Sequence, residues 1–202
     1  MFAEQVLFAV RRFWVYNSGM NNLFIEGPIQ TGKSTTIRNV LKDAFGPELF
    51  GVRGFTSQRI TDPEGKLLAF RLAPAEAELS IVADPSRLDN IFKSFTPDGT
   101  RVDMTVFETA GIDYMKKALA DARAGRAHTI LLDEIGGHEL ASEKFRRQLY
   151  ELLDSEIPCI GVIKSSENTR HMDADLLQLN QELHDRITGF SCHLRRIAST
   201  TI

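Results

Sequence analysis

The chain of 202 residues has 24 Lys plus Arg and 27 Asp plus Glu, and the formal net charge of −3 excludes a polybasic nucleic-acid-binding arm. With 43% hydrophobic and 25% charged residues, the composition is typical of a globular protein, and the length favours one domain. No apolar run reaches the roughly 18 residues that a membrane-spanning helix requires. The two cysteines lack metal-ligand spacing, which indicates neither a disulfide framework nor a zinc site and favours a cytoplasmic protein.

The N-terminal segment Phe2–Val15 has apolar residues at helical spacing. Its two arginines come near its end, whereas a secretory signal would carry its positive charge before the apolar stretch. We therefore predict that residues 1–19 form a helical extension, packed on the domain or on a protein partner such as a second copy of the chain. Residues 20–202 are predicted to form the folded domain. A membrane-surface helix and a natural start at Met20 are alternatives.

A strand, a glycine-rich loop and a helix are predicted next along the chain. The apolar run Leu23–Ile25 leads into the loop Gly27–Ser34. The segment Ile37–Ala44 then has apolar residues at helical spacing, and Gly46-Pro47 follows as a stop signal.

The segment after this helix favours β structure. Two β-compatible stretches within Val52–Leu72 flank Asp62-Pro63-Glu64-Gly65, a turn-forming tetrad that would join antiparallel strands. From Ala73 to Asp103 the sequence has little periodicity, and we expect irregular structure with short strands there.

The second half of the chain alternates helices with apolar strands, which is typical of a parallel α/β sheet. The predicted fold class is therefore α/β, with a mostly parallel sheet flanked by helices and an antiparallel β-hairpin. The predicted elements are a helix over 112–122, a strand at 130–132, a helix that buries Phe145, Leu149, Leu152 and Leu153, a strand at 157–163, a helix with Asp173 as N-cap that uses Leu176, Leu177 and Leu183, and a β-like stretch at 190–197.

The loop Gly27–Ser34 matches the phosphate-binding pattern G-x-x-x-x-G-K-[ST], between a predicted strand and a predicted helix as the pattern requires. Backbone N–H groups at such a helix N-terminus can surround phosphate oxygens, where side chains would crowd them. We expect Lys33 to contact the β- and γ-phosphates and the Ser34 hydroxyl to bind Mg²⁺. A glycine turn that only opens a helix would need no lysine at this position. The predicted nucleotide-binding residues are Gly27, Pro28, Ile29, Gln30, Thr31, Gly32, Lys33, Ser34 and Thr35.

Two acids follow the predicted strand at 130–132. Asp133 has the position from which P-loop enzymes hold Mg²⁺, commonly through water. Glu134 would point to the other side of the strand end and activate the attacking water, so we predict Lys33 and Glu134 as the catalytic residues. A structural role for Glu134 in a salt bridge or at a helix start is the alternative. No N-K-x-D motif occurs in the sequence, so guanine specificity has no support.

The sequence resembles a small nucleoside-triphosphatase family, which includes the vertebrate cancer-related nucleoside-triphosphatase and its bacterial and archaeal relatives. The likeness runs from about residue 20 to about residue 164. The resemblance implies a P-loop NTPase fold with a mixed sheet, and Mg²⁺-dependent hydrolysis of nucleoside triphosphates with little base preference. The residues that carry it are the loop Gly27–Ser34, Gly54-Phe55-Thr56, Phe107-Glu108 with Gly111, Asp133-Glu134-Ile135-Gly136, Glu139-Leu140 and Phe145.

The sequence departs from this family at two places. Gly137 and His138 follow the D-E-I-G segment where the family usually has a lysine, and Ser57-Gln58-Arg59 replaces an acidic pair. Arg53 and Arg59 are candidates for the missing positive charge near the γ-phosphate, although each can also be a solvated cation on a strand. His138 is more simply an exposed loop histidine.

Three hypotheses about function follow. The first is a Mg²⁺-dependent phosphohydrolase that converts nucleoside triphosphates such as ATP or GTP to diphosphate and phosphate, with broad base specificity. The second is a nucleotide or small-molecule kinase, which would need a lid and a second substrate site. The third is a nucleotide-gated regulatory module with slow hydrolysis, which the N-terminal helix and its Trp14 would support.

Overall fold

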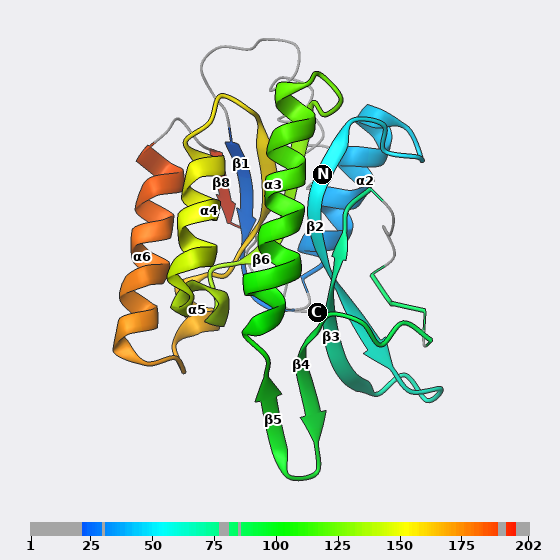
Figure 1. The fold of residues 1–202 in the computed structure, drawn as a ribbon. Coiled ribbons are helices and arrows are strands. Elements are labelled where there is room, and N and C mark those ends of the chain that lie inside the picture. Colours follow the sequence, from blue (N-terminus) through cyan, green and yellow to red (C-terminus); the bar gives the residue numbers. More distant parts are fainter. Residues whose placement is uncertain (1–21, 30, 77–80, 85, 190–192, 197–202) are drawn as a thin grey trace.

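A mixed sheet with helices on both faces forms the fold of the described residues, which are 22–29, 31–76, 81–84, 86–189 and 193–196 of the computed structural model (Figure 1). The sheet contains eight strands in the order β5-β4-β3-β2-β6-β7-β1-β8 in this part of the chain. The strands are β1 (Asn22–Glu26), β2 (Val52–Thr61), β3 (Leu67–Pro74), β4 (Ile91–Thr96), β5 (Gly99–Val102), β6 (Thr129–Ile135), β7 (Cys159–Ile163) and β8 (His193–Arg196). The helices are α2 (Lys33–Phe45), α3 (Ile112–Arg123), α4 (Glu143–Leu153), α5 (Ser166–Thr169) and α6 (Ala174–Gly189), with short helices η1 (Phe107–Gly111) and η2 (His138–Ala141).

The strands β2, β6, β7, β1 and β8 pair in parallel, so their carboxyl ends meet at one edge of the sheet. The strand β7 lies between β1, which leads into the glycine-rich loop, and β6, which ends in the two acids. Ligands of parallel α/β sheets bind at the carboxyl ends of the strands. The topology therefore places both halves of the predicted site at the same edge.

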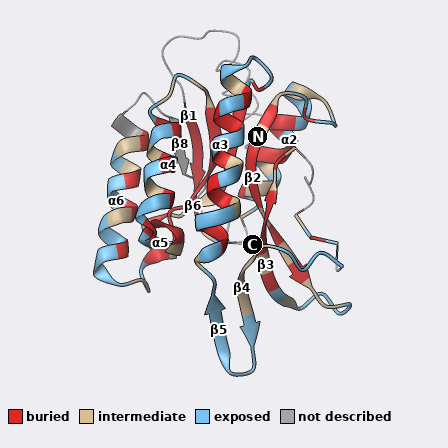
Figure 2. Ribbon diagram, in the orientation of Figure 1, coloured by how far each residue is buried: buried red, intermediate tan, exposed pale blue. Residues whose placement is uncertain are grey.

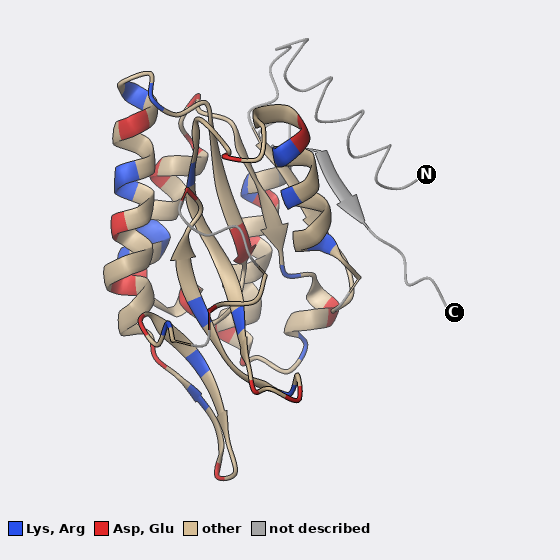
Figure 3. Cartoon of the chain, turned by 90° about the vertical axis from the view of Figure 1, so that its right-hand side faces the viewer, with Lys and Arg blue, Asp and Glu red and all other residues tan. Residues whose placement is uncertain are grey.

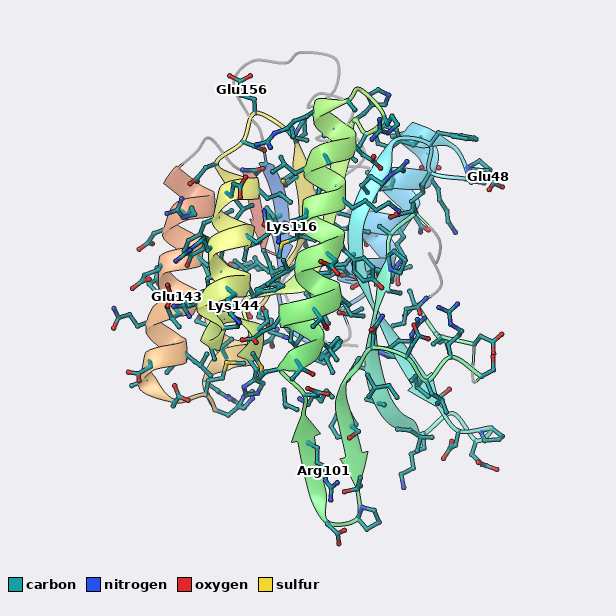
Figure 4. All side chains as sticks on the ribbon, in the orientation of Figure 1. Glu48, Arg101, Lys116, Glu143, Lys144 and Glu156 are labelled. Carbon is teal, nitrogen blue, oxygen red and sulfur yellow. The ribbon has the colours of Figure 1, made fainter. Side chains whose placement is uncertain are left out.

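Two apolar cores separate the layers. On β1, Leu23 and Ile25 belong to the core under α2, and Phe24 belongs to the core under α3, α4 and α6. This alternation is what a strand buried on both faces requires. The polar faces of the helices point outward, where Figure 4 labels Lys116 on α3 and Glu143 on α4. The predicted α/β fold with a mostly parallel sheet and an antiparallel hairpin is confirmed.

The strands β2, β3, β4 and β5 form the antiparallel half. The hairpin predicted around Asp62-Pro63-Glu64-Gly65 is confirmed as β2–β3. In the stretch 73–103, predicted to be irregular with short strands, the short strands β4 and β5 form a second hairpin at the end of the sheet, and this hairpin is mostly exposed (Figure 2). Because all four residues of β5 are exposed, this strand has no alternation of buried and exposed positions for a sequence pattern to reveal.

Two details of the helix predictions are wrong. Ala44 is exposed, and Phe45 packs against the core in its place. Leu177 is 37% exposed, whereas Leu176 and Leu183 are buried as predicted. The N-cap prediction is confirmed, because the Asp173 side chain accepts a hydrogen bond from the Leu176 amide at 2.9 Å.

Several predictions concern parts of the chain that are not described. The N-terminal helix Phe2–Val15 and the start at Met20 lie outside the described residues. Of the stretch at 190–197, β8 is described and pairs with β1. Among the described residues, none of the helices has the length and hydropathy to cross a membrane.

A buried arginine joins the antiparallel strands to the loop before β4. Arg71 is fully buried, donates to Gln58 Oε1 at 2.7 Å and forms an ion pair with Asp89 at 2.8 Å. Hydrogen bonds from Arg87 and Arg71 lower the pKa of Asp89 to about 2.

We expect Asp89→Asn to lower the free energy of unfolding at pH 7 by about 0.5–1 kcal/mol, because Asp89 is 47% exposed and solvent weakens the ion pair. Since the folded-state pKa lies below the ordinary value of 3.8, this stabilisation is present above about pH 4 and is lost as the pH falls toward 2. Urea unfolding of both proteins at pH 7, 5 and 3 measures the difference. A difference that grows on acidification would contradict this assignment.

Candidate nucleotide site

The glycine-rich loop joins β1 to α2 and forms one wall of a cavity. Gly32 has a φ of 78° and directly precedes the first residue of α2, a left-handed conformation that favours glycine. The Thr31 hydroxyl donates to the Pro28 carbonyl at 2.9 Å and closes the loop on itself. We call the cavity of about 350 Å³ above this loop the phosphate cavity; its lining residues are Thr31–Thr35, Arg38, Ser57, Arg59, Phe70, Ile81 and Glu134.

Lys33 is the first residue of α2, and its ammonium lies within the loop. It donates to the carbonyl of Gly27 at 2.9 Å and to that of Pro28. Burial lowers the pKa of Lys33, and the nearby carboxylates of Glu134 and Asp133 act in the opposite direction. A cation that two acids help to keep charged is well placed to contact phosphate oxygens in this cavity.

The Ser34 hydroxyl donates to Asp133 Oδ1 at 2.8 Å, across 99 residues of sequence. Asp133 lies near the end of β6 and is only 2% exposed. Burial raises the pKa of Asp133, while the Arg38 guanidinium and the hydroxyls of Ser34 and Thr56 lower it. The structure thus brings the two predicted Mg²⁺ residues into direct contact.

Arg38 was not among the predicted site residues, although it lies at the centre of the site. Its Nη2 pairs with Asp133 Oδ2 at 2.9 Å and also donates to Thr56, while its Nε and Nη1 have no hydrogen-bond partner among the described residues. Thr56 donates to the same Oδ2 at 2.9 Å. Ser34 and Arg38 are four residues apart on α2 and so share a helix face, which is the sequence signal that could have identified Arg38.

Glu134 faces the phosphate cavity, but plain alternation along the strand does not place it there. Its φ is 66°, a left-handed value that is uncommon for a residue with a side chain, and the β6–β7 register shifts between Leu132 and Ile135. This irregularity sends the half-buried carboxylate of Glu134 into the cavity, away from the position that Asp133 occupies under α2. Bulges of this kind commonly redirect a side chain beside a ligand site.

The loop after Glu134 is held by a buried acid. Glu139 Oε1 accepts a hydrogen bond from the Gly137 amide at 2.7 Å, and Glu139 itself is buried. Gly136 has a φ of 94°, and a Cβ there would approach the Asn180 side chain to 2.7 Å. Glu139 therefore fixes the backbone that carries Glu134. The sequence showed Glu139 only as one of the residues that carry the family resemblance and predicted no role for it.

Lys164, directly after β7, supplies a cation that the sequence did not predict. A Cβ added to Gly137 would lie 2.7 Å from Lys164 Nζ, so this ammonium lies at the point where a side chain at position 137 would begin. From α5, Asn168 donates to the Gly27 carbonyl at 2.8 Å and connects the end of β7 to the glycine-rich loop. The Lys164 ammonium thus lies where the family's lysine after the D-E-I-G segment would begin. Because Lys164 is 27 residues beyond Gly137, no local sequence pattern indicates this replacement.

The two arginines considered for the missing charge have different positions. Arg53 pairs with Asp121 of α3 at 2.7 Å and does not line the phosphate cavity, so it is a structural cation. Arg59 lines the phosphate cavity together with Glu134. Gln30 lies outside the described residues, and the other residues of the predicted loop lie between β1 and the first turn of α2.

The donor set around Ser34 and Asp133 fits magnesium. No group of three or more His, Cys, Asp or Glu side chains that could hold a metal occurs within the described part of the chain. Magnesium is usually bound through one or two carboxylates, retained waters and substrate phosphates, without a cage made only of protein groups. One hydroxyl and one carboxylate beside a phosphate-binding loop provide that kind of partial site.

Comparison with known proteins gives the family. The model of a family described as NTPase matches residues 22–189, which include the glycine-rich loop, both acids and Lys164. The chain belongs to the NTPase family.

Similar proteins of known name support this membership of the NTPase family. The chain is 29% identical over 145 residues to the nucleoside-triphosphatase THEP1 of Aquifex aeolicus, covering 70% of this chain and 74% of the relative. It is 29% identical over 146 residues to the Thermotoga petrophila protein of the same name, covering 72% and 73%. Among solved structures, THEP1 from Aquifex aeolicus has a TM-score of 0.58 at 21% identity, covering 88% of this chain and 90% of that one. A human cancer-related nucleoside triphosphatase has a TM-score of 0.57 at 19% identity, covering 89% and 90%, so this NTPase shares their P-loop fold.

Proposed function

We propose that this NTPase hydrolyses nucleoside triphosphates to diphosphate and phosphate, that it requires Mg²⁺, and that it accepts several bases. The observation that carries the proposal is the 2.8 Å hydrogen bond between Ser34 and Asp133, because it joins the phosphate-binding loop to the acid of a distant strand. The names of the THEP1 relatives as nucleoside-triphosphatases support the reaction.

Different residues of the site bind the phosphates, stabilise the developing charge and transfer the proton. The N–H groups at the start of α2 and the Lys33 ammonium bind the phosphate chain, and Lys33 offsets charge that develops on the γ-phosphoryl oxygens. Glu134 orients a water molecule and accepts its proton as the water oxygen bonds to the γ-phosphorus. The bond from the γ-phosphorus to the β–γ bridging oxygen breaks, the electron pair remains on the nucleoside diphosphate, and Glu134 passes its proton to the released phosphate.

Magnesium, when bound, would neutralise negative charge on the β- and γ-phosphates. Ser34 and Asp133 are the residues that would hold it, with Asp133 acting through water. Arg38 and Thr56 occupy Asp133 Oδ2, which leaves Oδ1 on the side of Ser34. The ion pair with Arg38 counteracts the burial that raises the pKa of Asp133 and so favours the charged form.

Broad base specificity is supported by the position of the phosphate cavity at the glycine-rich loop, where it suits the phosphate chain of the nucleotide. The residues that line the phosphate cavity surround the phosphate chain, which is common to all nucleoside triphosphates. The sequence contains no N-K-x-D motif that would select guanine.

A phosphate-release assay across ATP, GTP, CTP and UTP, with and without Mg²⁺, tests the proposal. We expect release from all four substrates only with the metal, and a loss of about 100-fold or more with Lys33→Ala, because a cation aimed at developing charge is removed. Lys66→Ala is the matched control, since Lys66 is exposed in the β2–β3 turn. Equal release by Lys33→Ala and the parent protein would contradict the assignment of the site.

Glu139 is expected to act as a positioning residue. Glu139→Ala removes the acceptor of the Gly137 amide and should lower kcat about tenfold with little change in KM, because the backbone that aims Glu134 loosens. Glu139→Gln keeps an oxygen that can accept this hydrogen bond and should retain most of the activity. Steady-state kinetics of both variants measure the effect, and an equal loss in the two would contradict a role based on this hydrogen bond.

A further inference from the structure

A second cavity adjoins the phosphate cavity. Its volume is about 270 Å³, and it shares Lys33, Arg59, Phe70 and Glu134 with the phosphate cavity. We call it the adjoining cavity. Because Glu134 borders both spaces, a molecule in the adjoining cavity would lie next to the carboxylate that faces the γ-phosphate.

Four basic side chains line the adjoining cavity and not the phosphate cavity. Lys93 comes from β4, His138 from η2, Lys164 from the end of β7, and His171 from the segment after α5. Figure 3 shows that Lys and Arg also gather along the strands of the antiparallel half, whose β4–β5 hairpin contributes the wall that carries Lys93. Lys93 and Lys164 therefore bring positive charge from two distant parts of the chain to a cavity that Ile29 and Lys33 of the glycine-rich loop also line.

The two lysines face two acids in this cavity but form no close ion pair with either. Neither Lys93 nor Lys164 has an ion pair with a carboxylate of the described residues, and the acids that line the cavity are Glu134 and Glu139. Burial lowers the pKa of Lys93 and the Lys164 charge lowers it further, while the Glu134 carboxylate acts in the opposite direction. The prediction of an exposed loop histidine at position 138 is wrong, because His138 is partly buried on η2, and burial and then both lysines lower its pKa. Two like charges that line one cavity and act on each other favour a bound anion, which would relieve their mutual repulsion.

Aromatic rings also line the adjoining cavity. Phe70 stacks on Phe92 with ring centroids 6.1 Å apart, and Phe92 contacts Phe107 at 4.9 Å. Phe95 meets the edge of Phe70 at 6.0 Å, and Lys93 Nζ lies 5.4 Å from the centre of the Phe95 ring. Rings and cations in one small cavity suit a flat ligand that carries negative charge.

We propose that the adjoining cavity binds a phosphate monoester with an aromatic ring, at the same time as the triphosphate occupies the phosphate cavity. The phosphate group contacts Lys93 and Lys164, and the ring packs on the phenylalanines of β3 and β4. This second ligand goes beyond the proposed hydrolysis, which needs only the triphosphate and water.

Calorimetric titration of the whole chain tests the proposal, with the phosphate cavity filled by a saturating β,γ-imido triphosphate analogue and Mg²⁺. The probes are phenyl phosphate, UMP and inorganic phosphate. We expect phenyl phosphate and UMP to bind, and inorganic phosphate to bind at least tenfold more weakly because it lacks the ring. Equal affinity for inorganic phosphate would overturn the aromatic part of the proposal, and absence of heat from all three probes would overturn the site.

The variants Lys93→Ala and Lys164→Ala are each expected to weaken phenyl phosphate binding about tenfold, because each removes a charge-assisted contact. Arg101→Ala is the matched control. Arg101 lies on β5 of the same hairpin (Figure 4) and does not line the adjoining cavity. Its neighbour Val102, which pairs with Lys93, does line the cavity. Unchanged binding in both lysine variants, or an equal loss in Arg101→Ala, would overturn the assignment.

The same titrations separate this proposal from the proposed function. If the imido analogue itself does not bind, the nucleotide site is wrong. If the analogue binds and protects the protein from thermal unfolding while no monoester binds on top of it, the nucleotide site stands and the second site is wrong.

Discussion

Replacing Glu134 with Gln is expected to lower kcat for phosphate release by about 100- to 1,000-fold and to leave the affinity for the triphosphate within about threefold. Glutamine has nearly the same shape as glutamate but cannot accept the proton of the attacking water. The bulge that directs residue 134 into the cavity is made by the backbone, so the variant keeps its position. Phosphate release measures kcat, and calorimetry with an imido triphosphate analogue measures binding.

A matched control for this variant is Glu48→Gln, since Glu48 is an exposed acid after α2 (Figure 4) and lines neither cavity. We expect the control to hydrolyse triphosphates at the parent rate. If Glu134→Gln does the same, Glu134 is not the base, and its carboxylate has a structural role such as pairing with a neighbouring cation.

Loss of the buried Arg38 is expected to lower the free energy of unfolding by about 3–5 kcal/mol in the variant Arg38→Met. Arg38 is 4% exposed and Asp133 is 2% exposed, so removal of the guanidinium would leave a buried carboxylate without its counter-charge. Burial already raises the pKa of Asp133, and loss of Arg38 should raise it further. Urea unfolding at pH 7 measures the change.

The pair can be tested by a double-mutant cycle. Because Asp133→Asn removes the uncompensated charge, the double variant Arg38→Met with Asp133→Asn should be more stable than Arg38→Met alone. Arg147→Met is the control for an exposed pair, since Arg147 and Glu143 are 80% and 75% exposed, and it should cost about 0.5 kcal/mol or less. Strictly additive effects of the two buried substitutions would show that Arg38 does not stabilise the Asp133 charge.

Much of the fold follows from local sequence patterns. The buried strands β1, β6 and β7 are short apolar runs, and the helices α2, α3 and α4 each have one apolar face, so their spacing predicts their type. The loop before α2 has a motif with a specific physical purpose, and the contact of Ser34 with Asp133 follows once both are placed at the same edge of the sheet.

The remaining parts of the site depend on contacts between distant segments. Lys164 lies beside Gly137 because β7 pairs with β6. Lys93 lines the adjoining cavity together with Lys164, but it comes from a hairpin that has no periodic pattern. Glu134 owes its direction to a bulge, which a single sequence does not reveal. The hypothesis of a nucleotide-gated module depends on the segment Phe2–Val15, which lies outside the described residues and stays a prediction.

The left-handed backbone at Glu134, with a φ of 66°, lowers the stability of the fold at the same position that catalysis requires. A glycine there would remove a conformational cost of roughly 1–2 kcal/mol, and it would also delete the proton acceptor. Selection of variants for heat resistance alone should therefore favour inactive Glu134→Gly proteins, and screens of this enzyme need a turnover readout beside the melting temperature.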